Sequence, residues 1–240
     1  MPPIDISVVV PVFDEEEAAP RLAREIAAAF EGMAYEMVFV DDASRDATRD
    51  TLIALKAELP TLRVVAHGRN AGQSRAIRTG VMAARGAVIV TLDGDGQNDP
   101  ADAPRLARRL LEGPPGLAMV GGVRAKRRDT LAKKAASRIG NGVRKALLKD
   151  GAVDTGCGLK AMRREAFLRL PYFDHIHRYL PALMLREGFE IAFEPVNHRA
   201  RESGRSKYSN LGRLWASASD LFGVMWLRTR ARDPGESRES

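Results

Sequence analysis

The chain has 240 residues, of which 45% are hydrophobic and 29% charged, as is ordinary for a soluble globular protein with one large α/β domain or two small ones. Its single cysteine, Cys157, excludes an intramolecular disulfide bond and weakly favours a reducing compartment. The net charge of +7 is uneven, because residues 124–149 hold ten Lys or Arg against one acid, a local charge of +9. This segment indicates an anionic partner, and a solvated helix face is the simpler alternative.

The first half of the chain alternates between two patterns. Apolar, β-branched runs predict strands at residues 6–12, 35–40, 62–67, 87–92 and 118–123. Helical periodicity predicts helices between them at about 16–30, 46–59, 72–85 and 103–111. Strands separated by helices of this length form βαβ units, so we expect an α/β fold with a mostly parallel, Rossmann-like sheet flanked by helices.

The second half is less regular. We expect a basic amphipathic helix at 131–148, a turn at "DTGCG", short helices at 163–170 and 179–187, and a strand at 190–196. A basic, glycine-bearing loop then leads to an amphipathic helix at 211–228. The sequence therefore divides into an α/β domain (1–210), a C-terminal amphipathic helix (211–228) and a disordered tail (229–240).

Acidic residues follow three of the predicted strands. Asp14 and Glu15 come after the first strand, Asp41 and Asp42 end the second, and "LDGDGQNDP" follows the fourth. Parallel strands bring their carboxyl ends to one edge of a sheet, where ligands bind. Any one of these clusters, taken alone, is more simply explained as turn and cap residues than as a binding site. Three clusters at one edge favour a binding site.

The segment "LDGDGQNDP" carries three aspartates in seven residues. Asp93 and Asp95, two residues apart on a turn, would share a divalent cation, Mg²⁺ or Mn²⁺, whose remaining ligand would be a diphosphate. Gly94 and Gly96 would let the backbone approach that ligand closely. We expect Asp99, next to Pro100, to cap the following helix.

Five segments occur in the order "VVVPVFDEE", "VFVDDAS", "NAGQSRAIRTG", "LDGDGQNDP" and "DTGCGLKAMRRE". In this order and spacing they resemble the family-2 glycosyltransferases of the GT-A fold, in the subgroup of dolichyl- and polyprenyl-phosphate sugar synthases (dolichol-phosphate mannosyltransferase-like). The resemblance runs from about Ile6 to Tyr208 and does not identify the sugar.

The resemblance implies a nucleotide-sugar donor, linked to UDP or GDP, and a divalent metal ion. The implied donor-binding residues are Pro11, Asp14, Glu15, Asp42, Asn70, Gly72, Asp93, Gln97, Arg201 and Lys207. The implied metal and diphosphate residues are Asp93, Asp95 and Gln97, with Asp95 as the most direct ligand. Position 14 departs from the family, in which asparagine is the commoner residue.

The resemblance also implies a polyprenyl phosphate acceptor. Its phosphate would meet Arg124, Lys133, Ser137 and Arg138, although arginine is more usual where Lys133 stands. The basic loop would close over the diphosphate and acceptor through Arg199, Arg201, Ser206 and Lys207. Together with Asp93 and Asp95, the catalytic set is Arg124, Lys133, Ser137, Arg138 and Asp154.

Elementary chemistry fits this reaction, a sugar transfer with inversion. A phosphate monoester is already anionic near neutral pH, so the acceptor needs positioning and screening more than deprotonation. A hydroxyl acceptor on a lipid, sugar or protein is the first alternative and would require a base, for which Asp154 is the candidate. Asp154 also reads as a cap or a hydrogen-bond partner of the acceptor loop. The second alternative is an anion-binding module that uses residues 124–149 without metal.

The remaining expectations concern location and partners. The apolar runs are too short to span a membrane and no signal peptide is expected, so we predict a cytoplasmic protein held peripherally on the cytoplasmic face of the membrane. The tryptophans of the 211–228 helix suit a lipid interface, while a core or dimer helix suits the pattern equally. A membrane-protein partner or a homodimer remains open, and no nucleic acid is expected. We expect a structural or acceptor-loop role for His175 and His177, and we expect Cys157 to be a packed residue.

Overall fold

The computed structural model describes residues 4–124, 147–152, 154–199 and 210–232. Seven strands form one sheet: β1 (Ile6–Val12), β2 (Tyr35–Asp41), β3 (Leu62–Ala66), β4 (Val88–Thr91), β5 (Leu117–Arg124), β6 (Lys160–Arg163) and β7 (Glu190–Val196). The helices of the described residues are α1 (Ala18–Ala29), α2 (Thr48–Leu55), α3 (Gln73–Ala83), α4 (Ala103–Leu111), α6 (Arg164–Arg169), α7 (Leu180–Arg186) and α8 (Asn210–Thr229), with 3-10 turns η1 (Pro100–Asp102) and η2 (Ile176–Arg178).

The sheet has the strand order β3-β2-β1-β4-β6-β5-β7. Strands β1 to β4 pair in parallel, and β5 pairs in parallel with β7. Only β6 runs against its neighbours, between β4 and β5. The predicted mostly parallel α/β sheet flanked by helices is therefore confirmed.

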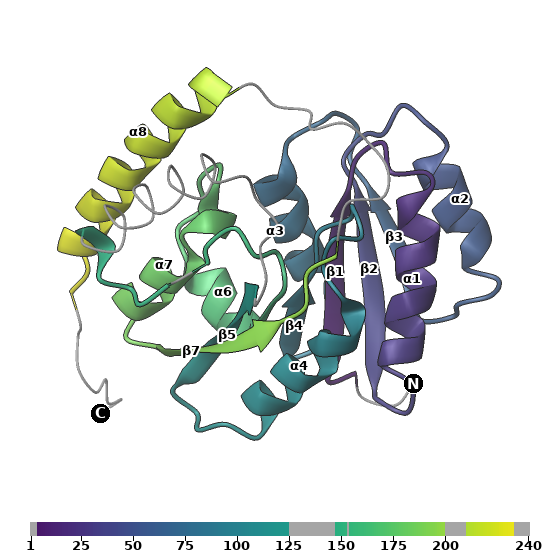
Figure 1. The fold of residues 1–240 in the computed structure, drawn as a ribbon, viewed down its shortest axis with the longest axis horizontal. Helices are drawn as coiled ribbons and strands as arrows, with labels where there is room; N and C mark the ends of the chain where they lie inside the picture. Colours follow the sequence, from purple (N-terminus) through teal and green to yellow (C-terminus); the bar gives the residue numbers. More distant parts are fainter. Residues whose placement is uncertain (1–3, 125–146, 153, 200–209, 233–240) are drawn as a thin grey trace, which may run out of the picture.

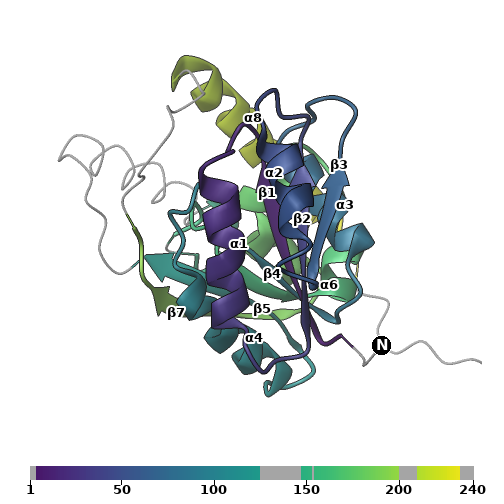
Figure 2. The same ribbon diagram turned by 90° about the vertical axis from the view of Figure 1, so that its right-hand side faces the viewer.

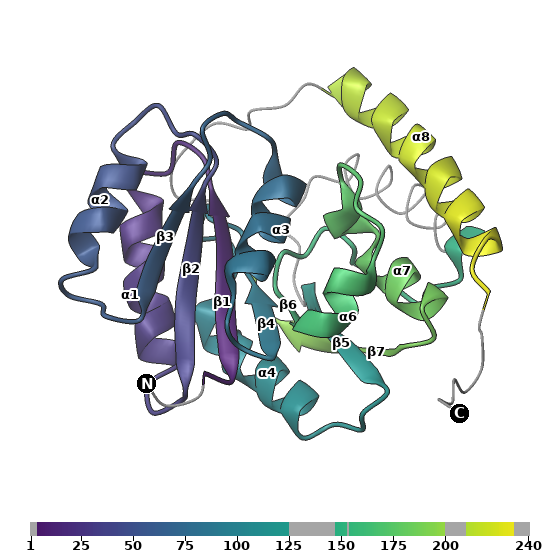
Figure 3. The same ribbon diagram turned by 180° about the vertical axis from the view of Figure 1, so that it is seen from behind.

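Helices cover both faces of the sheet. In Figure 1 α1 and α4 lie in front of the strands, whereas Figure 3 shows α3, α6 and α7 on the opposite face. Figure 2 shows the same division, with α4 on one side of the strands and α3 on the other. Alternate residues of β1 supply the two cores, since Val8 and Val10 face α1 and α4 while Val9 faces α3.

The strand β6 was missed by the sequence prediction, which passed directly from a turn to a helix. This strand has four residues, begins and ends with a basic residue, and continues at once into α6. Such a segment shows no alternation, and its pairing partners are distant in sequence. The other predicted strands and helices of the described residues are present with shifts of a few residues at their ends.

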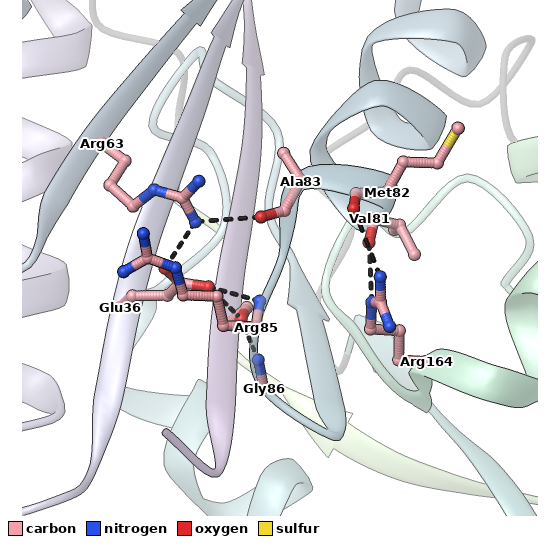
Figure 4. A network of polar contacts seen from close by, with 9 residues as sticks. Glu36, Arg63, Val81, Met82, Ala83, Arg85, Gly86 and Arg164 are labelled. Atoms are coloured by element: carbon pink, nitrogen blue, oxygen red, sulfur yellow. Dashed lines mark hydrogen bonds and ion pairs between the residues drawn. The ribbon is translucent and has the colours of Figure 1, made fainter. Parts of the chain in front are cut away.

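Glu36 at the start of β2 is the centre of a polar network at the amino end of the sheet (Figure 4). Its carboxylate accepts hydrogen bonds from Ser7 Oγ (2.7 Å), Arg63 Nη1 (2.7 Å) and the Arg85 backbone N–H (2.7 Å). Ser7 Oγ in turn accepts the N–H of Gly86 at 2.9 Å. Burial alone would raise the pKa of Glu36, but these bonds outweigh it and hold the pKa below its usual value. The network is structural.

Helix α8 packs against α7 on the side of the molecule away from α1 and α2 (Figures 1 and 3). In its described half, Val224 is buried, while Phe222 and Trp226 are 67% and 58% exposed. Within the described residues, no helix combines the length and apolarity needed to cross a membrane. The predicted 131–148 helix lies outside the described residues except at its end, and so does most of the predicted tail.

Candidate active site

The carboxyl ends of β2, β1 and β4 lie side by side, since these strands are consecutive in the sheet. The predicted acidic clusters follow these three strands, so they meet at one edge of the sheet. Pro11 belongs to β1 and pairs with Val40 of β2. The carboxyl edge is thus the candidate site, as Rossmann-like topology dictates.

The acidic residues after β1 bind the loop after β2. Asp14 accepts the backbone N–H of Arg45 at 2.7 Å, and its own N–H donates to Ser44 Oγ at 2.9 Å. The Glu15 N–H donates to Thr48 Oγ1 at 2.8 Å. Asp14 has a positive φ of 49°, a conformation that asparagine and aspartate tolerate better than most residues. Asp14 and Glu15 therefore fix the shape of this end of the edge.

Asp42 organises the segment that leads into α3. It is 3% exposed, and its two carboxylate oxygens accept the N–H groups of Ala71 and Gly72, both at 2.8 Å. His67 Nδ1 lies 2.7 Å from the same carboxylate, and Asn70 Nδ2 donates to the Asp42 carbonyl at 3.1 Å. Asp42, Asn70 and Gly72, all predicted to bind the nucleotide-sugar donor, are thus in contact. Both carboxylate oxygens of Asp42 accept hydrogen bonds from backbone N–H groups.

Asp93 and Asp95 form the loop after β4. Asp93 is partly exposed; its N–H donates to Asn98 Oδ1 at 2.9 Å, and its Oδ1 accepts a hydrogen bond from Gln73 Nε2 at 2.8 Å. Asp95 Oδ1 accepts the N–H of Gln97 at 3.2 Å. Burial, followed by the charge of Asp95, raises the pKa of Asp93 to about 6. A carboxylate with a raised pKa beside a second carboxylate is stabilised by a cation.

Two glycines shape this loop by close approach. A Cβ at Gly94 would overlap the carbonyl of Pro11, so Gly94 lets the loop pack on β1. The expectation that Gly94 and Gly96 serve ligand approach stays a prediction. A Cβ at Gly158 would overlap the Asp93 carboxylate itself. Only glycine fits behind this side chain.

The end of the loop is tied to the segment after β7. Asp99 accepts the N–H of Ala101 at 3.1 Å and caps η1, which confirms the predicted cap. Arg199 pairs with Asp99 at 2.7 Å and with Glu25 at 2.5 Å, and its N–H donates to the Gln97 carbonyl at 2.9 Å. Arg199 therefore braces the loop from the side of α1.

Arg124 and Asp154 form a bidentate ion pair. Arg124 Nε and Nη2 each lie 2.6 Å from a different oxygen of Asp154, and the Arg124 N–H donates to the same carboxylate at 3.3 Å. Burial opposes the charge of Arg124, but its bonds to Asp154 raise its pKa overall. The structure thus brings together the cation predicted for the acceptor phosphate and the candidate base.

Lys160 is a neighbouring residue that the sequence reasoning did not single out. It is 5% exposed, and Nζ donates to the carbonyl of Cys157. Burial lowers the pKa of Lys160, while the charges of Asp93 and Asp154 act in the opposite direction. Cys157 is buried as predicted, and burial raises its thiol pKa. The carbonyl of Gly158, next in the chain, accepts Thr91 Oγ1 at 2.8 Å, which fixes the loop under Asp93.

His175 and His177 point to different partners. His175 Nδ1 lies 2.9 Å from Asp220 of α8, whereas His177 Nδ1 lies 2.7 Å from Ser74 Oγ in α3. Burial, then the nearby Lys160 charge, holds the pKa of His177 well below its usual value. Both histidines join elements together, in agreement with their predicted structural role.

Several predicted residues lie outside the described residues. They are Lys133, Ser137 and Arg138 of the acceptor set and Arg201, Ser206 and Lys207 of the basic loop. Their assignments stay predictions, as do the catalytic and donor-binding roles of the residues described above.

The residues present fit a divalent cation that is completed by substrate. Within the ranges that the structure describes, no three His, Cys, Asp or Glu side chains gather as a self-sufficient metal site. Asp93 and Asp95 supply two carboxylates, and Mg²⁺ is commonly held by one or two carboxylates together with substrate phosphates and water. The raised pKa of Asp93 indicates that a positive charge would stabilise the site.

The sheet order and the acidic carboxyl edge define a GT-A-type fold. A model of glycosyl transferase family 2 matches residues 7–170, more than half of the chain. The protein therefore belongs to glycosyl transferase family 2.

Among curated relatives, the chain is 39% identical over 211 residues to an undecaprenyl-phosphate 4-deoxy-4-formamido-L-arabinose transferase of Enterobacter sp. (strain 638). It is 37% identical over 210 residues to a protein of the same name from Salmonella enteritidis PT4 (strain P125109). Each match covers 85% of this chain and 62% of the relative, so the chain spans less than two thirds of their length.

Solved structures agree on the fold. Glucosyl-3-phosphoglycerate synthase from Mycobacterium tuberculosis, in complex with Mn²⁺, uridine diphosphate and glucosyl-3-phosphoglycerate, superposes with a TM-score of 0.71. The match covers 97% of this chain and 82% of that one at 22% identity. A second crystal structure of that enzyme, with Mg²⁺ and uridine diphosphate, also gives 0.71, at 21% identity.

Proposed function

We propose that the protein is an inverting glycosyltransferase that moves a sugar from a nucleotide-sugar donor to a polyprenyl phosphate. The product would be a lipid-phosphate sugar for modification of cell-envelope glycan or lipid. The observation that carries the proposal is the identity of 39% and 37% to two undecaprenyl-phosphate sugar transferases over 85% of this chain. The acidic edge after β1, β2 and β4 supports it independently, because it offers a site for a cation and a diphosphate.

The donor would lie at the carboxyl edge. Asp93, Asp95 and Gln97 would hold Mg²⁺ or Mn²⁺ and the diphosphate, and the bound cation would supply charge stabilisation for the leaving diphosphate. Asp42, with Asn70 and Gly72, would shape the nucleotide end of the site. Pro11, Asp14 and Glu15 would border it on the other side. Arg201 and Lys207 would complete the donor site from the basic loop.

The acceptor would approach from the side of Arg124. The Arg124–Asp154 pair favours a phosphate acceptor over a hydroxyl, because Asp154 already accepts three N–H groups from Arg124. A carboxylate that is bonded in this way orients the guanidinium, and its oxygens already have partners. Lys133, Ser137 and Arg138 would add positive charge and hydrogen bonds for the same phosphate.

The substitution Asp154→Asn separates the two acceptor classes. With a phosphate acceptor, we expect a moderate loss of transfer and an unchanged dependence on pH, because no proton is removed. With a hydroxyl acceptor, the same change would remove the base and flatten the pH profile. Alanine substitutions at Lys133, Ser137 and Arg138 should abolish transfer to lipid phosphate while nucleotide binding survives. Full activity in these variants would overturn the phosphate acceptor.

We further propose a peripheral position on the cytoplasmic face of the membrane. The support is the outer face of α8, where Phe222 and Trp226 are largely exposed and Arg230 lies 5.7 Å over the Trp226 ring. Exposed aromatic side chains beside a cation suit an interface with anionic lipid. The polyprenyl chain of the acceptor would reach the site from that surface. A membrane-protein partner or a second copy would use the same face.

The decisive experiment is a thermal-shift panel of UDP- and GDP-sugars with and without Mn²⁺, followed by transfer to undecaprenyl phosphate. We expect one nucleotide sugar to raise Tm only when Mn²⁺ is present, and its sugar to appear on the lipid. Binding of polyanions that ignores Mg²⁺, falls steeply with salt and survives Asp95→Asn would instead show an anion-binding module. Transfer to a hydroxyl compound alone would establish the first alternative.

A further inference from the structure

Gln73 is the first residue of α3 and is not among the residues predicted above to bind the metal, donor or acceptor. Its side-chain amide crosses from α3 to the end of β4 and donates to Asp93 Oδ1 at 2.8 Å. The contact joins residues 20 positions apart. Gln73 therefore touches the carboxylate proposed to hold the cation, without belonging to that loop.

Two further contacts limit the position of Asp93. Its backbone N–H is held by Asn98, and the backbone of Gly158 lies against the carboxylate so closely that no side chain fits there. The terminal torsion of an aspartate is broad when nothing restricts it. A hydrogen bond from Gln73 selects one orientation and so directs the second carboxylate oxygen.

The turn that carries Gln73 is itself held on both sides. On one side, the carboxylate of Asp42, which directly follows β2, accepts the N–H groups of Ala71 and Gly72 at 2.8 Å each. Ser74, which is 1% exposed, lies 2.7 Å from Nδ1 of His177 in η2. His177 stays uncharged near neutral pH because burial keeps its pKa well below its usual value. This support does not change with physiological pH.

The chemistry of the glutamine amide suits this task. An amide donates a hydrogen bond without a net charge, so the carboxylate is oriented and keeps its own charge for a cation. A lysine or arginine in this place would neutralise Asp93 and repel the cation. Groups that bond to metal ligands in this way typically alter metal affinity or activity by about 10- to 100-fold when they are removed.

We propose that Gln73 is a positioning residue for the cation and diphosphate site, acting through Asp93. The inference rests on the proposed function, since it presumes that Asp93 meets a divalent cation. Gln73 fixes Asp93 Oδ1, and the turn held by Asp42 and His177 fixes Gln73.

The test compares Gln73→Ala and Gln73→Met, both neutral and without an amide donor, with Met82→Ala, a control on the same helix at a side chain that is 60% exposed. Mn²⁺ binding is measured by titration, alone and with UDP or GDP, beside Tm and steady-state transfer. We expect both Gln73 variants to keep the wild-type Tm and to bind Mn²⁺ roughly tenfold more weakly. The transfer rate should fall with the acceptor KM unchanged, and Met82→Ala should match the wild type.

Three outcomes would overturn the inference. Wild-type Mn²⁺ binding by Gln73→Ala would show that the hydrogen bond positions nothing. A fall in Mn²⁺ binding that follows a fall in Tm in both variants would show a purely structural role. Gln73→Met keeps a side chain of similar length without its donor, so it separates a packing defect from the lost hydrogen bond. If the wild type binds neither Mn²⁺ nor a nucleoside diphosphate, the proposed function fails as well, so the two failures are distinguishable.

Discussion

Two carboxylates at opposite ends of the sheet show how this chain separates stability from function. Glu36 at the amino end receives hydrogen bonds from a hydroxyl, a guanidinium and a backbone N–H, and its pKa is lowered (Figure 4). Asp93 at the carboxyl end has an amide donor, and burial and the charge of Asp95 raise its pKa to about 6 although the charges of Lys160 and Arg124 act in the opposite direction. The Glu36 carboxylate thus accepts hydrogen bonds from three groups, whereas, among the described residues, the Asp93 carboxylate accepts one, from Gln73.

The difference has a physical meaning. A buried carboxylate with matched donors contributes to folding, because the charged form is better stabilised than in water. A carboxylate pushed toward its neutral form costs folding free energy, and such groups concentrate at binding and catalytic sites. The amino end is therefore a structural network, whereas the carboxyl end has the electrostatics expected of the proposed cation site. Substitutions at the two ends should have opposite consequences.

The largest effect is expected for Asp93→Asn. On the proposed function, the change removes one of two carboxylates for the cation and diphosphate, and loss of one such electrostatic contact costs roughly 10²- to 10³-fold in rate. Stability should be unchanged or raised, because a partly buried charge and its repulsion with Asp95 disappear. Transfer rate and Tm, measured together, check this prediction. Asp50→Asn, at an exposed site on α2, is the matched control, and wild-type transfer by Asp93→Asn would refute the metal site.

The next largest effect is expected for Glu36→Ala, which should lower stability and leave ligand binding intact. Ser7, Arg63 and the Arg85 N–H all lose their acceptor, and we expect a loss of about 3 kcal/mol of unfolding free energy, discounted because Arg63 is partly exposed. Nucleotide and Mn²⁺ binding should survive. Urea unfolding gives the measurement. Glu58→Ala, which breaks the exposed pair with Arg24, should change little; an equal loss there would show that burial is not the cause.

The sequence predicted the parts of this contrast that depend on local pattern. The β-branched runs located β1, β2 and β4, and the acids after them fell at one edge because parallel strands share that edge. The Asp99 cap was also readable, since an aspartate before a proline at a helix start has a local signature. The fold and the position of the candidate site were therefore accessible from the sequence.

Contacts between distant segments were not accessible. Arg124 and Asp154 are 30 residues apart, and no local pattern in either segment predicts that they form a bidentate ion pair. The bond from Gln73 to Asp93 and the position of Lys160 depend on how α3 and β6 pack, and β6 itself lacks an alternating pattern. Asp42 was predicted as a donor residue, yet its oxygens bind the backbone before α3. Such partners are chosen by tertiary packing, which local composition does not encode.

The smallest expected effect is a difference in how Asp93 and Glu36 change the free energy of unfolding as the pH falls. Above about pH 6 Asp93 is ionised and its burial costs stability; as the pH falls through about 6 toward the unfolded value of 3.8, this cost is removed. Glu36 behaves oppositely, since its stabilisation is present above the unfolded value of 4.5 and is lost only as the pH falls through its lowered pKa.

Between pH 7 and 5, the metal-free protein should therefore gain stability from Asp93 without losing the contribution of Glu36, and Asp93→Asn should lack this gain. Protons also compete with the cation for Asp93, so Mn²⁺ affinity should fall below pH 6 by at most about tenfold per unit. Unfolding curves and Mn²⁺ titrations at matched pH check both signs. A wild-type protein whose Mn²⁺ affinity is constant from pH 7 to 5 would show that Asp93 does not bind the ion as a carboxylate.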